Sequence, residues 1–225
     1  MPHALGRLFR RHVVNVQVSL RYHRDTVKLV ASSLKPLMPM DDQTARDLHR
    51  IASYVDPYIR STPLHITASA YIIDPPSRRV LVRWHSVVKN WIQVGGHIDA
   101  EDTDPLAAAL REAQEETGLP DLKPLCTLTP WTPLQAVSVV VPESHKEPGH
   151  KHLDLRYLFE TRLPDLCTPE HADNPVRWLT YDAAEDDIND STVLAGIRMI
   201  ASLATSTNNF LTCDMIHAKE MLRIQ

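Results

Sequence analysis

Three glutamates, Glu112, Glu115 and Glu116, stand close together in the segment 95–119. A helix advances about 100° per residue, so it would turn Glu115 and Glu116 about 60° and 40° to either side of Glu112 and place all three on one face. Like charges held this close repel one another unless a cation neutralises them. A hard divalent cation such as Mg²⁺ or Mn²⁺ takes carboxylate oxygens and usually brings a phosphate with it. The spacing therefore predicts a metal-dependent enzyme that acts on a phosphorylated small molecule.

A helix over residues 105–117 is expected to carry these glutamates. Either Asp104 or Thr103 caps its N-terminus, Pro105 suits the first helical position, and Gly118 suits its end. The opposite side is expected to pack on a sheet through Leu106, Leu110, Ala113 and Thr117.

A glycine loop precedes this helix. Gly95 and Gly96 follow the apolar, strand-like residues 91–94, and glycines there let the backbone approach a metal or a phosphate. The strand, loop and helix together resemble the Nudix box, G-x5-E-x7-R-E-U-x-E-E-x-G-U, in which U is aliphatic. The matching residues are Gly96, Arg111, Glu112, Ala113, Glu115, Glu116, Gly118 and Leu119.

The first acidic position of the box departs from the family pattern. Asp102 replaces the glutamate, and eight residues instead of seven separate it from Arg111. Three acids are therefore candidates for the supporting role that the family gives to this position: Asp102, Asp99 or Glu101. Arg111 is expected to point away from the glutamates, about 100° from Glu112, and to brace the glycine loop through such a partner.

The resemblance implies hydrolysis of a diphosphate linkage in a nucleoside diphosphate joined to another group. It implies that Mg²⁺ or Mn²⁺ is bound by Glu112, Glu115 and Glu116, with the Gly96 carbonyl as a further ligand. The general base is either Glu112 or a loop acid such as Glu147. One alternative is a catalytically silent nucleotide-binding or regulatory module of the same fold. A second alternative is a structural or assembly protein whose main role lies in its N-terminal helices. The presence of all three helix glutamates favours the enzyme over the silent module.

Other residues are expected to contact the substrate. Arg83 and Lys89 supply cations for phosphate oxygens, and Trp91 either stacks on a base or packs within the sheet. His152 and Asp154 belong to a His-x-Asp-x-Arg-Tyr sequence that is similar to one found in a subset of Nudix enzymes, where it would help to bind substrate.

Three histidines near residue 150 look superficially like a zinc site. His145, His150 and His152, with Asp154, lie in and after a loop that contains no cysteine and no familiar zinc spacing. Histidines that contact substrate or solvent are therefore the expected interpretation.

The remaining pattern predicts an α/β (α+β) fold. Strands are expected at 65–73, 79–84, 91–94, 125–131, 134–141, 152–161 and 176–179, and a late helix at 191–204. This order indicates a mixed sheet between helices, the alpha-beta-alpha sandwich implied by the Nudix resemblance. We place that domain at residues 61–225 and an N-terminal helical extension at residues 1–60.

The extension begins with 24 residues that contain five arginines and no acid. This composition is typical of an organelle transit peptide, but a helix that packs on the domain or on a partner subunit is favoured, and it suggests a homodimer. A second helix is expected from Asp41 and Asp42, with an apolar stripe formed by Ala45, Leu48, Ile51, Ala52 and Val55.

Composition limits the setting of the protein. The 225 residues are 43% hydrophobic and 23% charged, as in soluble globular proteins, and no apolar run is long enough to span a membrane. Three scattered cysteines suggest a reducing, cytoplasmic location. Residues 1–60 carry ten Lys and Arg against five Asp and Glu, whereas the remainder carries 14 against 23. The acidic remainder argues against nonspecific nucleic-acid binding.

Overall fold

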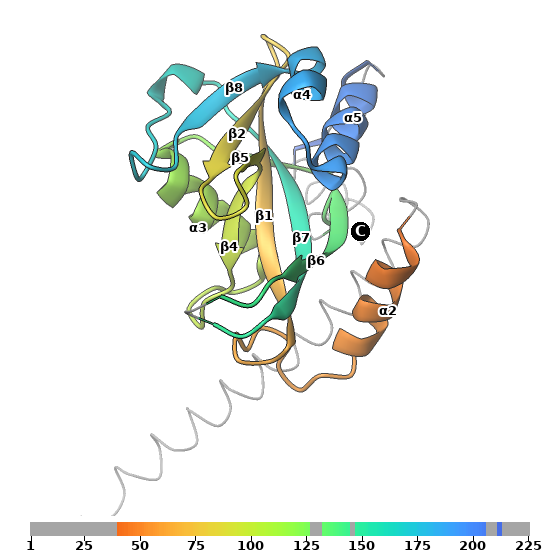
Figure 1. Cartoon of the computed structure of the whole chain (residues 1–225). Helices are drawn as coiled ribbons and strands as arrows, with labels where there is room; N and C mark the ends of the chain where they lie inside the picture. The colour runs from red at the N-terminus through yellow and green to blue at the C-terminus, as the bar shows by residue number, and fades with distance from the viewer. Residues whose placement is uncertain (1–39, 127–131, 145–146, 206–210, 213–225) are drawn as a thin grey trace, which may run out of the picture.

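The computed structural model describes residues 40–126, 132–144, 147–205 and 211–212 (Figure 1). Its α-helices are α2 (Asp42–Ile51), α3 (Pro105–Thr117), α4 (Tyr181–Asp187) and α5 (Ser191–Thr205), and a 3-10 helix spans Pro164–Leu166. Its strands are β1 (Leu64–Asp74), β2 (Arg79–His85), β3 (Asn90–Ile92), β4 (Val94–His97), β5 (Lys123–Cys126), β6 (Gln135–Val141), β7 (His150–Glu160), β8 (Val176–Thr180) and β9 (Leu211–Thr212).

Two long strands, β1 and β7, run parallel through the middle of a mixed sheet. On the side of β1 that faces away from β7, residues 67–70 pair with β4 and residues 72–74 pair with β2. On the far side, β7 pairs with β6 and with β5 in the same way. The edge partner of β1 thus changes from β4 to β2 part-way along, and the glycine loop lies in β4, beside the middle of β1.

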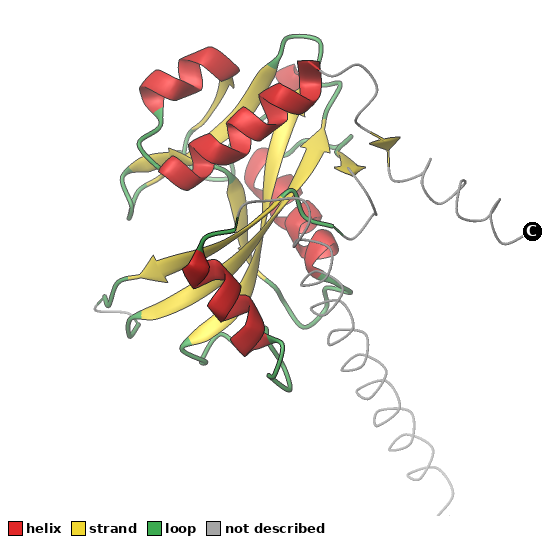
Figure 2. Cartoon of the chain, turned by 90° about the vertical axis from the view of Figure 1, so that its right-hand side faces the viewer, coloured by secondary structure: helices red, strands yellow, loops and turns green. Residues whose placement is uncertain are grey.

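Alternate residues of β1 belong to two separate cores. Ile66, Ala68, Ala70 and Ile72 pack with the alanines of α3, whereas Tyr71 and Ile73 pack with α4 and α5. Figure 2 shows α3 behind the strands and α4 and α5 in front of them. The predicted sandwich with a mixed sheet is therefore confirmed.

The strand predictions are largely confirmed. Gln93 separates the expected strand 91–94 into β3 and β4, which pair with different neighbours. The helix α4 was not predicted from the sequence. Residues 127–131 of an expected strand lie outside the described residues.

Helix α2 begins at its predicted cap, because the Asp41 carboxylate accepts a hydrogen bond from the Thr44 N–H at 2.8 Å. The predicted apolar stripe is wrong at both ends, since Ala45 is exposed and Val55 is 62% exposed. Polar side chains on α2 are buried in their place. Asp47 accepts hydrogen bonds from Ser138 of β6, from Lys151 of β7 and from Gln43.

The residues before Met40 lie outside the described part of the chain. The arginine-rich helix, the transit peptide and the homodimer therefore stay predictions, as does a domain boundary near residue 60. Within the described part, no helix combines the length and the apolar character that crossing a bilayer requires.

Candidate functional site

Small side chains bring α3 close to the sheet. Asp104 caps the helix by accepting a hydrogen bond from the Ala107 N–H at 2.9 Å, and Gly118 ends it in the left-handed conformation. Ala108, Ala109 and Ala113 are fully buried against β1 and β4. Leu106 and Leu110, which were expected to form this face, are only half-buried beside it. Alanines therefore decide which face of α3 meets the sheet.

The two glycines of β4 allow a close approach on both sides. Gly95 has φ of 144°, and a Cβ atom there would lie 2.5 Å from the Cα atom of Ser69. A Cβ atom on Gly96 would lie 2.6 Å from Oε1 of Glu112. A side chain at position 96 would therefore displace the Glu112 carboxylate from its place beside β4.

Arg111 joins the glycine loop to the helix. Its guanidinium donates two hydrogen bonds to Asp102, at 3.0 and 2.9 Å, and one to the His97 carbonyl at 3.0 Å. Asp102 is thus the bidentate partner among the three candidate acids. Asp99 lies 3.6 Å from Arg111 and pairs with Arg60 at 2.8 Å. Asp102 also accepts the Asp99 N–H, which closes the loop.

The expected direction of Arg111 is partly wrong. Besides bracing the loop, its Nη1 atom lies 3.0 Å from Oε1 of Glu112 and 3.0 Å from Oε2 of Glu115. The long side chain spans both directions because its planar head offers several donors. Glu112 and Glu115 therefore converge on one cationic group.

Glu116 is the most buried of the three glutamates. Its Oε1 atom is 3.0 Å from Nη1 of Arg83, and its Oε2 atom accepts the Gly95 N–H at 3.0 Å. Burial raises the pKa of Glu116 to about 7, although Arg83 and the Gly95 N–H lower it. The nearby charge of Glu112 raises the Glu116 pKa further. Burial also raises the pKa of Glu112, against the effect of Arg111.

The carboxylates of these three glutamates are suitable ligands for a hard divalent cation. Glu112, Glu115 and Glu116 offer carboxylate oxygens, the ligands that Mg²⁺ and Mn²⁺ prefer. Two arginines already neutralise the glutamates, Arg111 at Glu112 and Glu115 and Arg83 at Glu116. Each of the three carboxylates is thus next to a positively charged group already. Because Gly96 has no side chain, its backbone is accessible to a bound cation as well.

The family model of the NUDIX domain matches residues 63–196 of this sequence. The chain belongs to the Nudix family. The match covers more than half of the chain, and it spans β1, the glycine loop, α3 and most of the sheet.

Solved structures resemble the Nudix domain in fold. A NUDIX-family hydrolase from Clostridium perfringens is 22% identical, covering 60% of this chain and 97% of that one, with a TM-score of 0.47. The dihydroneopterin triphosphate pyrophosphohydrolase of E. coli is 15% identical over 61% and 93%, with a TM-score of 0.44. A C. elegans Ap4A hydrolase complex is 16% identical over 63% and 96%, with a TM-score of 0.46. No curated protein matches the sequence significantly.

Three residues expected to contact the substrate are either exposed or paired with protein groups. Lys89 is exposed in the turn between β2 and β3. The Trp91 ring packs against Trp84 and carries the Arg177 guanidinium 4.9 Å from its centroid, which is the sheet-packing alternative. Arg83 is paired with Glu116, as described above.

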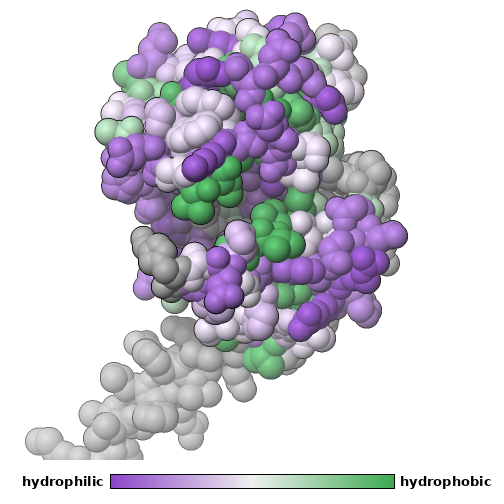
Figure 3. Space-filling view, in the orientation of Figure 1, coloured by the Kyte–Doolittle hydropathy of each residue, from purple (hydrophilic) through white to green (hydrophobic). Residues whose placement is uncertain are grey.

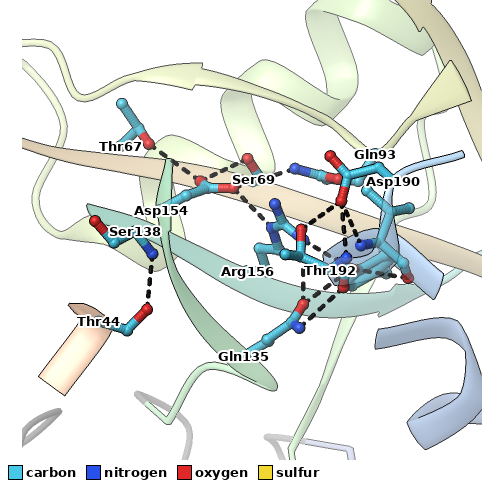
Figure 4. A network of polar contacts seen from close by, with 12 residues as sticks. Thr44, Thr67, Ser69, Gln93, Gln135, Ser138, Asp154, Arg156, Asp190 and Thr192 are labelled. Atoms are coloured by element: carbon cyan, nitrogen blue, oxygen red, sulfur yellow. Dashed lines mark hydrogen bonds and ion pairs between the residues drawn. The ribbon is translucent and has the colours of Figure 1, made fainter. Parts of the chain in front are cut away.

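Asp154 is buried at the centre of a polar network between β1 and β7 (Figure 4). Its carboxylate accepts hydrogen bonds from Thr67, Ser69, Gln93 and Arg156, at 2.8–3.1 Å. The substrate-binding role expected for Asp154 is thus limited to positioning, because protein donors surround both oxygens. Arg156 extends the network by donating hydrogen bonds to Tyr71, Gln135 and Thr192.

His152 lies in a group of four histidines, of which the sequence had brought together only His150 and His152. His65 is its register partner on β1, and His97 and His150 stack on His65 with ring centroids 5.2 and 5.3 Å away. Burial lowers the pKa of His65, that of His97 to about 4 and that of His152 to about 3. Asp154 is not among the groups that converge here, and His145 lies outside the described residues.

Glu147 is exposed on the loop before β7. In the described part of the chain, its backbone N–H donates to the Ser144 hydroxyl and its carbonyl accepts the Ser144 N–H. The Glu147 charge acts to raise the pKa of His65 and of His97, against the larger effect of burial. Figure 3 shows the face of the molecule that is turned to the viewer in Figure 1, where hydrophilic side chains surround a few hydrophobic ones.

Proposed function

We propose that this Nudix protein hydrolyses a diphosphate linkage in a nucleoside diphosphate joined to another group, with Mg²⁺ or Mn²⁺ as the cofactor. Two sets of contacts support this proposal: Glu112 lies against Gly96 and shares Arg111 with Glu115, and Glu116 accepts the Gly95 N–H. Such an ion, when bound, neutralises phosphate oxygens and lowers the pKa of a water ligand.

We assign the metal-binding role to the three glutamates and to the Gly96 carbonyl. Glu112 touches the loop backbone and Glu116 is bonded to the Gly95 N–H, so the helix and the loop would hold the cation from two sides. Arg111 and Asp102 keep these two elements in register through their paired hydrogen bonds.

Arg83 is the residue that we expect to move from carboxylate to phosphate. Its only ion pair in the described structure is with Glu116, and its Nε atom is buried without a hydrogen-bond partner there. A divalent cation on Glu116 would compete with that ion pair, and the freed guanidinium is suited to bind phosphate oxygens.

A carboxylate must accept the proton of the attacking water. Glu112 is half-buried with a raised pKa, which favours a base at neutral pH. Glu147 is the alternative base, because it lies on the neighbouring loop. Glu147→Gln distinguishes them, because Glu147 is not among the proposed metal ligands. If Glu147 is the base, this variant should lose turnover and keep its metal affinity; if Glu112 is the base, it should keep its turnover.

The test is hydrolysis by the purified protein of a panel of nucleoside triphosphates, sugar nucleotides, dinucleoside polyphosphates and coenzyme A, with Mg²⁺ or Mn²⁺. Phosphate release with and without added phosphatase separates phosphoester products from free phosphate. Hydrolysis that a chelator abolishes would support the proposal. Binding of a nucleotide without any turnover across the panel would instead favour the silent module.

A further inference from the structure

The histidine group lies at the N-terminal ends of β1 and β7, outside the carboxylate site. His65 of β1 is opposite His152 of β7 in the parallel register, and His150 begins β7. His97, at the end of β4, packs edge-on against His152 with ring centroids 5.0 Å apart. Three strands thus bring together rings that are far apart in the sequence.

Backbone carbonyls fix the orientation of two of these rings. Nδ1 of His65 is 3.0 Å from the Thr62 carbonyl, and Nδ1 of His150 is 2.9 Å from the Pro148 carbonyl. A carbonyl only accepts, so Nδ1 carries the proton in both rings and Nε2 carries a lone pair, which at His150 accepts a hydrogen bond from Nε2 of His152. Carbonyls hold metal-binding histidines in the same way.

The Nε2 atom of His65 has an unusual environment. His65 is fully buried, and its Nε2 atom finds no hydrogen-bond partner among the described residues. Native proteins rarely leave a buried acceptor unpaired without a reason, and binding of a metal ion is one such reason.

The nitrogen atoms of three rings face a common point. One ligand atom each from His65, His150 and His152 lies within 4.8 Å of the others, and the two Nε2 atoms of His150 and His152 are 2.9 Å apart. A tetrahedral zinc ion, with bonds of about 2.0–2.1 Å, would hold such atoms about 3.3 Å apart. Ring movements of about 1 Å would therefore suffice.

We propose that His65, His150 and His152 bind one Zn²⁺ ion, or a similar transition-metal ion, at a site separate from the magnesium site. Imidazole nitrogens select zinc, copper or nickel, whereas carboxylate oxygens select magnesium. Nε2 of His152 carries the proton of its hydrogen bond to His150, and when the ion binds this proton moves to Nδ1 of the same ring, which stays neutral. Three histidines leave a fourth position for water or for the nearby Glu147 carboxylate.

This site would fasten β7 to β1 beside the glycine loop. His97 follows Gly96 directly and packs on the ion-binding rings, so the ion would restrain the loop without touching the diphosphate. The inference does not depend on the proposed hydrolysis, because a protein without hydrolytic activity could hold the same ion.

The test uses the full chain, freed of metal by a chelator and titrated with Co²⁺ and then Zn²⁺ in excess Mg²⁺. Magnesium occupies oxygen sites, so the visible bands of nitrogen-bound Co²⁺, and their loss on adding Zn²⁺, report the histidine site alone. We expect one Zn²⁺ per chain. Affinity should fall at least about a hundredfold in His150→Gln and in His152→Ala.

Two further variants serve as controls. His49→Gln changes an exposed histidine of α2, and Glu112→Gln changes the carboxylate site, so both should bind Zn²⁺ as the wild type does. A rise in melting temperature with Zn²⁺ in the wild type but not in His150→Gln would agree. His150 is only half-buried, so this variant should fold, and circular dichroism checks that it does.

Three results would overturn the proposal. The first is equal Zn²⁺ affinity in the wild type and in folded His150→Gln. The second is loss of Zn²⁺ binding in Glu112→Gln, which would place the ion at the glutamates. The third is a wild type that shows neither Co²⁺ bands nor a rise in melting temperature with Zn²⁺.

Discussion

Replacing Glu116 with glutamine separates the function of the carboxylate from its effect on stability. The side chain keeps its size but loses one charge and one of two acceptor oxygens. Arg83 and the Gly95 N–H each use one of those oxygens, so one donor would face the new NH₂ group. Losing that bond costs about 1–3 kcal/mol.

Burial acts in the opposite direction. The rise of the Glu116 pKa from 4.5 to about 7 means that keeping the carboxylate ionised in the folded protein costs about 3 kcal/mol at neutral pH. Glutamine removes this cost, so the metal-free variant should be as stable as the wild type or up to about 2 kcal/mol more stable. The cost is full above about pH 7 and absent below about pH 4.5, so the difference should shrink as pH falls.

Turnover of the Glu116→Gln variant should fall, although its stability does not. Loss of a metal-binding charge should lower turnover at least about a hundredfold, which corresponds to about 2.7 kcal/mol of transition-state stabilisation. Denaturant unfolding without metal and initial rates with Mg²⁺ are the two assays, and Glu185→Gln on the exposed surface of α4 is the matched control. Turnover within tenfold of the wild type, or a loss of more than about 3 kcal/mol of stability, would refute this reasoning.

Three other substitutions test the supporting structure. Gly96→Ala would place a methyl group 2.6 Å from a Glu112 oxygen, so metal affinity by calorimetry should fall at least about tenfold. Arg111→Lys keeps the charge but loses the bidentate fork, so turnover should fall about tenfold or more. Asp47→Asn should cost about 1–3 kcal/mol in denaturant unfolding, because a buried acceptor of Lys151 loses its charge. Burial is the largest single effect on the Asp47 pKa and raises it, but the hydrogen bonds to Asp47 together lower the pKa below its ordinary value. The ionised carboxylate therefore stabilises the fold above about pH 4, and this stabilisation is lost in acid.

For each of these three predictions, one result would contradict the reasoning. Unchanged metal affinity in Gly96→Ala would mean that Glu112 does not need the close approach. Full turnover in Arg111→Lys would mean that a single point charge suffices to hold the loop. An Asp47→Asn variant that keeps wild-type stability at neutral pH would mean that the α2 contact with β6 and β7 contributes little.

The local signals of the sequence predicted α3 and its loop well. Asp104, Pro105 and Gly118 act on the adjacent backbone, so their effect on helix ends can be read from the chain. The pairing of Arg111 with Asp102 was predictable for the same reason, because both belong to one short segment.

Features that depend on distant strands were not predictable. The histidine group needs the parallel register of β1 and β7, which sets His65 opposite His152 from 87 positions away in sequence. The burial of Asp154 likewise depends on Thr67 and Ser69 across that register. Periodicity also favoured leucines over alanines for the buried face of α3, because it measures hydrophobicity and not the space between helix and sheet.

The central claim is that the glutamates of α3 hold a divalent cation beside the glycine loop. A crystal soaked in Mn²⁺ and measured for anomalous scattering tests it most directly. We predict a peak within bonding distance of Glu112 and Glu116, with Arg83 displaced from Glu116. The claim is contradicted if, at saturating Mn²⁺, Arg83 and Arg111 keep their ion pairs and no anomalous peak lies among the three carboxylates.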